Sequence, residues 1–179
     1  MKNITKVIAF VSIAALFISC ASGPSLQKYY IDSQDNKNFI SLDVPASILK
    51  LKDSVTAEEK EALTSLKKFN ILAFKKDATN EAEFVLEKKK VKAILKNPKF
   101  TELMTIKDKR MNLVLKYEGD DDSIDEVIIY ASNKEHGFAL VRVLGDNMNP
   151  ANIMKLAQNM SKVDSDGFKQ LEGIFKNIN

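Results

Sequence analysis

The side chains with the most capacity for acid–base or metal chemistry lie in the second half of the chain. His136, the only histidine, stands in a predicted hairpin turn. A general base needs an ordered pocket and an orienting partner, so we expect a structural or solvent-facing role for it. The acidic run Asp120 to Asp122, with Asp125 and Glu126 behind it, could bind calcium through oxygen ligands. It lacks the spacing of an EF-hand loop, so we expect a solvated acidic hairpin without a metal.

Motifs of the common enzyme classes are absent from the sequence. It contains no glycine-rich phosphate loop, no nucleophile elbow and no paired-histidine metal motif. A lone cysteine excludes an intramolecular disulfide, and no Cys/His cluster exists for a structural zinc. We therefore expect no cofactor and no enzymatic activity. A hydrolase with an unrecognised carboxylate site is the alternative.

That cysteine, Cys20, directly follows an apolar stretch near the start of the chain. Lys2 and Lys6 precede the run from Val7 to Ile18, which is shorter than the roughly 20 residues of a membrane-spanning helix and is typical of an export signal. The order Phe-Ile-Ser-Cys at 17–20 resembles a bacterial lipobox, where a signal peptidase cuts before a lipidated cysteine. We expect residues 1–19 to be a lipoprotein signal peptide and Cys20 to carry the lipid. An ordinary signal peptide that contains a cysteine is the alternative.

Charge argues against nucleic acid as a partner. Removal of residues 1–19 takes two of the 27 Lys and Arg and none of the 24 Asp and Glu, which leaves a formal charge of +1. A near-neutral chain with interspersed charges has no strong field for nucleic acid. Residues 21–23, Ala-Ser-Gly, lack the acidic cluster of a Bacteroidota surface-export signal. We therefore expect a cell-envelope protein on the outer membrane that faces the periplasm.

The central element of the predicted fold is a meander of strands. Met111 to Tyr117 alternates apolar and polar residues, which is the period of a half-buried strand. Val127 to Tyr130 and Phe138 to Leu144 follow as strands, after connections rich in Gly, Asn and Asp. Phe100 to Ile106 fits either a further strand or a last helical turn.

The first half of the chain predicts a strand, a helix and a second strand. Phe39 to Val44 alternates as a strand. Thr56 and Glu59 form a capping box that begins a helix reaching Phe69. Ile71 to Phe74 is apolar on both faces, as in a central strand. This order favours a right-handed parallel crossover.

Helical spacing of apolar residues predicts the remaining elements. A short helix at Leu26 to Tyr30 is expected to pack loosely on the domain. Asn80 begins a helix that Pro98 terminates, and Asn149 with Pro150 begins another. The last helix carries its apolar residues at 168, 171, 175 and 178.

The meander and the helix after it resemble the Bacteroidota lipoprotein-like proteins catalogued as domain of unknown function 4252 (DUF4252). The matching segments are Phe100 to Met104, Met111 to Gly119, Ile124 to Ser132, Phe138 to Gly145 and Ile153 to Met160. The resemblance implies an exported, small single domain. It brings no established activity and no catalytic residues.

Two groups of residues could carry binding or modification. Both faces of the sheet are partly apolar, whereas a sheet covered on one side should alternate. Either the early or the final helix covers the second face, or Ile128, Tyr130, Val141 and Val143 contribute to an exposed interaction face. Asp-Ser-Val at 53–55 and Asp-Ser-Ile at 122–124 resemble acceptor sites for O-glycosylation, with Ser54 and Ser123 as the modified residues. Unmodified loops are the alternative.

We therefore predict one α+β domain over residues 26–179, joined by a tether at 20–25 to the lipid anchor. It is a mixed β-sheet with a C-terminal antiparallel meander, packed against amphipathic helices. The expected function is a non-enzymatic envelope module that binds an unknown protein partner, or acts in sensing or assembly. The alternative is a periplasmic carrier or receptor for an apolar or lipid-like ligand. The sequence specifies no oligomeric state.

Overall fold

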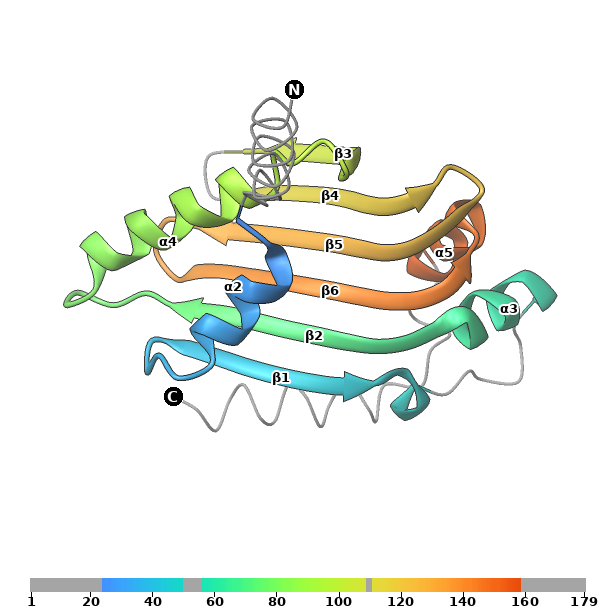
Figure 1. Ribbon diagram of the computed structural model, residues 1–179, viewed down its shortest axis with the longest axis horizontal. Coiled ribbons are helices and arrows are strands. Elements are labelled where there is room, and N and C mark those ends of the chain that lie inside the picture. Colours follow the sequence, from blue (N-terminus) through green and yellow to red (C-terminus); the bar gives the residue numbers. More distant parts are fainter. Residues whose placement is uncertain (1–23, 50–55, 109–110, 159–179) are drawn as a thin grey trace, which may run out of the picture.

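The computed structural model describes residues 24–49, 56–108 and 111–158. These residues form a six-stranded sheet with helices on both of its faces (Figure 1). The helices are α2 (Leu26–Ser33), α3 (Ala57–Ser65), α4 (Glu81–Ile94) and α5 (Pro150–Gln158), with a short 3-10 helix at Ala46–Ile48. The strands are β1 (Phe39–Pro45), β2 (Leu66–Lys75), β3 (Thr101–Lys107), β4 (Met111–Asp120), β5 (Ser123–Asn133) and β6 (Gly137–Met148). Their order is β1-β2-β6-β5-β4-β3.

The predicted α+β class and the C-terminal antiparallel meander are confirmed. Strands β3 to β6 pair consecutively, and the segment after Phe100 is a strand, with Thr101 opposite Tyr117. Both predicted turns are present. Gly119 and Gly137 adopt φ values of 127° and 117° there, a backbone conformation that glycine adopts readily because it has no Cβ.

The predicted parallel crossover is wrong, because β1 and β2 are antiparallel, with Val44 opposite Phe69. The predicted capping box forms, but α3 ends at Ser65, so Leu66 and Phe69 belong to β2 and not to the helix. A helix of nine residues spans about 14 Å and a strand of ten about 33 Å. α3 is therefore too short to carry the chain back along the sheet, and β2 returns beside β1.

Helices α2 and α4 cover one face of the sheet (Figure 1). α2 packs tightly and not loosely, because Leu26, Tyr29 and Tyr30 are only 3%, 7% and 5% exposed. The Tyr29 hydroxyl donates to Glu87 Oε2 of α4 at 2.9 Å, and that of Tyr30 donates to the Asn70 carbonyl of β2 at 2.9 Å. Each buried tyrosine thus gains apolar contact and a partner for its hydroxyl.

Helices α3 and α5 pack together at one end of the sheet, and they cover part of the opposite face (Figure 1). Phe69, Val127 and Val143 of the sheet share a core with Ile153 of α5 there. The early helix, predicted as one of two covers for this face, lies on the other side. The predicted final helix falls outside the described residues. No helix among the described residues is long and apolar enough to cross a membrane.

Candidate functional site

Two of the predicted modification sites, Cys20 and Ser54, lie outside the described residues. Ser123 begins β5 beside the acidic turn, and its hydroxyl donates to Asn147 Oδ1 at 2.9 Å. The side chain is half-buried. Asp120 ends β4, and Asp121 and Asp122 form the β4–β5 turn. No group of three potential metal ligands occurs within the described ranges.

The four predicted interaction residues do not share one surface. Ile128 and Tyr130 are each 1% exposed and belong to the core beneath α2 and α4. Val141 and Val143 point to the opposite face, where Val143 is buried and Val141 is half-buried. Consecutive strand residues alternate between faces, so the apolar run at 127–130 serves two cores. Only the face that carries Val141 stays partly accessible.

Apolar side chains cross this accessible face in rows, because the strand register aligns them. One row contains Ile40, Ala73, Ala139, Ala131, Leu113 and Ile106. The next contains Leu42, Ile71, Val141, Ile129, Leu115 and Met104. We call these two rows the open face. Their members on β1, β2, β4, β5 and β6 are half-buried.

The open face ends in large exposed residues at the β3 edge of the sheet. Met104, Ile106 and Met111 are 38%, 44% and 42% exposed, and we call them the edge patch. Met111 lies two residues before Leu113, so it projects from the same face. Exposed apolar clusters of this kind mark interaction sites more often than single exposed residues do.

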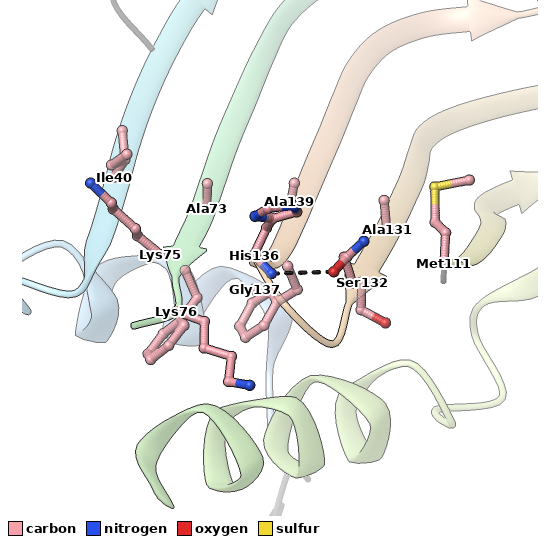
Figure 2. A pocket seen from close by; sticks show the side chains of 13 residues that line it. Ile40, Ala73, Lys75, Lys76, Met111, Ala131, Ser132, His136, Gly137 and Ala139 are labelled. Carbon is pink, nitrogen blue, oxygen red and sulfur yellow. Dashed lines mark hydrogen bonds between the residues drawn. The ribbon is translucent and has the colours of Figure 1, made fainter. Parts of the chain in front are cut away.

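A shallow groove of about 390 Å³ runs along the first row of the open face. Its floor consists of Ala73, Ala131 and Ala139 on three neighbouring strands, and Ile40 and Met111 stand at its two ends (Figure 2). Three methyl side chains in register leave room that larger residues would fill. No local pattern in the sequence marks this groove, because it depends on the alignment of three separate strands.

His136 borders the groove but has no arrangement for proton transfer. It is exposed in the β5–β6 turn, and its backbone N–H donates to Asn133 Oδ1 at 3.2 Å (Figure 2). No described side chain hydrogen-bonds its ring. A base held in one orientation needs such a partner.

Three carboxylates, Glu118, Asp125 and Glu126, gather beside the start of α2, and two of them pair with a cation. Glu126 accepts two hydrogen bonds from Arg142, at 2.6 and 2.8 Å, and both side chains are nearly buried. Glu118 pairs with Lys99 at 2.7 Å. The Tyr30 ring lies 5.5 Å from the Arg142 guanidinium, and burial raises the pKa of the Tyr30 hydroxyl far above its ordinary value. The arrangement stabilises the packing of α2, and both Glu118 and Glu126 are already paired with cations there.

A second hollow, absent from our sequence predictions, lies between α4 and strands β3 and β4. Lys88 and Lys92 of α4 line one wall of it together with Lys96, which follows the end of the helix, and Lys107 and Lys116 come from the strands. The signal was present in the sequence, since lysines four residues apart share one face of a helix. The strand lysines could be assigned to the same cleft only from the fold.

Comparison with known proteins identifies one family and no individual relative. A family model described as Domain of unknown function (DUF4252) matches residues 29–156. This segment contains nearly all of the described elements. No curated protein and no solved structure matches the chain.

Proposed function

Because the chain belongs to the DUF4252 family, whose description names no activity, we propose a function from the chemistry of its surfaces. The protein is a lipid-anchored module of the cell envelope that binds a protein partner and catalyses no reaction. The exposed edge patch carries this proposal, because it extends an apolar sheet face to the rim of the molecule.

The anchor would keep the domain close to the membrane. Residues 21–25 separate Cys20 from the first residue of α2, and five extended residues span at most about 18 Å. The apolar run before Cys20 and the neutral residues after it support lipidation and the periplasmic face of the outer membrane. Labelling with a fatty-acid analogue should modify the wild type and not Cys20→Ser. Equal labelling of both proteins would exclude the anchor.

The partner proposed for the edge patch is an extended apolar segment of another envelope protein. β3 is the last strand of the sheet, and within the described residues its outer side pairs with no strand. An edge strand can accept a further strand through backbone hydrogen bonds, while alternate side chains give specificity. Met104 and Met111 suit this role because methionine adapts to different apolar partners.

Site-specific photocrosslinking in cells tests this surface. A crosslinker at Ile106 should form an adduct with one envelope protein, and Met104→Lys should abolish that adduct. The matched control is a crosslinker at Leu86 on α4, which is apolar and 52% exposed but lies away from the edge patch. An adduct at both positions, no adduct, or an adduct of two copies of this chain would contradict the proposal.

The groove beside the edge patch favours a carrier for a small apolar ligand as the second candidate. Its alanine floor offers apolar surface, and its volume lies within the usual range of ligand sites. Ala139→Leu would fill the groove and leave the edge patch intact. Binding of a fluorescent fatty acid by the wild type that is lost in this variant, together with no crosslinked adduct at Ile106, would support the carrier over the partner.

A further inference from the structure

The cleft between α4 and the edge of the sheet is a concentrated source of positive charge. It measures about 500 Å³, and five lysines line it together with only two carboxylates, Glu102 and Asp108. Lysines come from both sides, since Lys92 lies on α4 and Lys96 just after its end, whereas Lys107 ends β3. An anion inside the cleft would therefore have cations on both sides of it.

These lysines outnumber the carboxylates that line the cleft with them. None of the five forms a salt bridge with a described residue. Lys116 Nζ donates to the Phe100 carbonyl at 3.2 Å, and Lys88 Nζ lies 5.3 Å from the centre of the Phe84 ring. Burial, together with the charge of Lys92 and other lysines, lowers the pKa of Lys88. The cleft thus repels cations and would gain free energy from a bound anion.

Polar atoms without partners lie at the floor of the cleft. Tyr130 and Asn112 line it, and within the described part of the chain neither the Tyr130 hydroxyl nor Asn112 Oδ1 forms a hydrogen bond. Tyr130 is 1% exposed. Its neighbour Ser132 is close enough to influence the pKa of the Tyr130 hydroxyl, but the two oxygens do not meet hydrogen-bond geometry. Buried polar groups are normally paired, so unpaired ones facing a cleft point to a ligand.

The chemistry of the two unpaired groups restricts the ligand. Burial raises the pKa of Tyr130, so its hydroxyl stays protonated at neutral pH and can donate to an anionic oxygen. Asn112 Oδ1 is an acceptor and needs a donor, such as a hydroxyl group of the ligand. Leu95 and Val114 add apolar wall for a short carbon skeleton. Lysine ammonium groups suit phosphate as point charges without fixed directionality.

We propose that this cleft binds a hydroxyl-bearing phosphate ester, such as a glycerol phosphate group. The lysines hold the phosphate, Tyr130 donates to one of its oxygens, and Asn112 accepts from a hydroxyl of the ligand. The same group occurs in soluble metabolites and in the headgroups of anionic lipids. The site is independent of the edge patch, which lies on the opposite face of the sheet.

Calorimetric titration of the full-length protein with glycerol 3-phosphate at low salt tests the site. Tyr130→Phe should weaken binding about tenfold or more, because it removes one hydrogen bond to a charged group. The double variant Lys92→Gln/Lys96→Gln should weaken it further. Lys89→Gln changes the charge of the same helix outside the cleft and should leave binding within about twofold of the wild type.

Folding controls accompany these variants. Tyr130→Phe removes a hydroxyl that forms no hydrogen bond with the described residues, so its unfolding midpoint should equal or exceed that of the wild type. A lower affinity in a protein at least as stable then reports lost contact and not lost structure. The proposal would be overturned if the wild type bound no glycerol 3-phosphate at millimolar concentration. It would also be overturned if Lys89→Gln lost as much affinity as Lys92→Gln/Lys96→Gln.

Two further probes identify the source of the phosphate group. Inorganic phosphate should bind more weakly than glycerol 3-phosphate, and equal binding would overturn the role of Asn112. Co-sedimentation with vesicles that contain phosphatidylglycerol tests the lipid. If the protein binds these vesicles and Tyr130→Phe weakens that binding, the ligand is a lipid headgroup. If Tyr130→Phe weakens the binding of glycerol 3-phosphate but the protein does not bind the vesicles, the ligand is a soluble metabolite.

Discussion

Replacement of Arg142 by methionine would leave the Glu126 carboxylate inside the domain without its counter-ion. The Arg142 and Glu126 side chains are 13% and 7% exposed. Two charge-assisted hydrogen bonds, at 2.6 and 2.8 Å, join them. Methionine retains much of the aliphatic part of the side chain, but it removes the guanidinium, and with it the contact with the Tyr30 ring. The change therefore removes the ion pair and this ring contact while it keeps most of the side-chain volume.

The expected decrease in the free energy of unfolding follows from the burial of the ion pair. Removal of one partner from a buried salt bridge costs about 3–5 kcal/mol, because a charge remains without compensation. We expect a value near the lower limit, about 3 kcal/mol, because a cleft of about 320 Å³ adjoins the pair and gives water access to the carboxylate. Domains of this kind have a free energy of unfolding of about 5–15 kcal/mol. The variant should therefore remain folded and measurable.

Urea unfolding measures this loss of stability. The chain contains no tryptophan whose fluorescence could report unfolding, so the transition is followed by far-ultraviolet circular dichroism. The matched control is Lys28→Met, which breaks the pair of Lys28 with Asp32. That pair has a similar distance of 2.9 Å, but its side chains are 73% and 55% exposed. We expect the free energy of unfolding of this control to fall by less than about 1 kcal/mol.

The double variant Arg142→Met/Glu126→Met completes the cycle. Replacement of both charges by apolar residues of similar length is often neutral, so this protein should be more stable than Arg142→Met alone. The reasoning is refuted if Arg142→Met loses no more than Lys28→Met. The cycle also needs the single variant Glu126→Met. The reasoning is equally refuted if the stability losses of Arg142→Met and Glu126→Met add in the double variant, because the effects of independent sites add.

Two further predictions use the same unfolding assay. Burial holds the pKa of Tyr29 and Tyr30 far above the ordinary value of about 10, so the folded protein keeps protons that the unfolded chain releases. Stability should be constant below about pH 10 and fall above it; a midpoint unchanged up to about pH 11.5 would contradict this. Gly137→Ala should cost about 3 kcal/mol or more, because φ is 117° and the new Cβ would lie 2.0 Å from the Phe74 carbonyl oxygen. Gly119→Ala, whose Cβ contacts begin at 2.8 Å, should lose less.

Local patterns in the sequence were sufficient to predict the strands and turns of the meander. The period of two in Met111 to Tyr117 identifies a strand because side chains alternate between faces whatever the strand pairs with. Glycine at 119 and 137 marks the turns because these positions need a positive φ. The capping box at Thr56 likewise depends only on residues within one helical turn. These features involve neighbours in the chain, so the sequence alone determines them.

Strand direction, face and register were decided only by the tertiary structure. Leu66 and Phe69 fit a helical period, but pairing with β1 and β6 places them in a strand. Ile128 was predicted as part of an interaction face and is instead core, because α2 and α4 both lie on its side of the sheet. The alanine groove and the lysine cleft each combine residues from three or more elements. Such sites follow from hydrogen bonding and packing between segments that are distant in the chain, and no local pattern encodes that pairing.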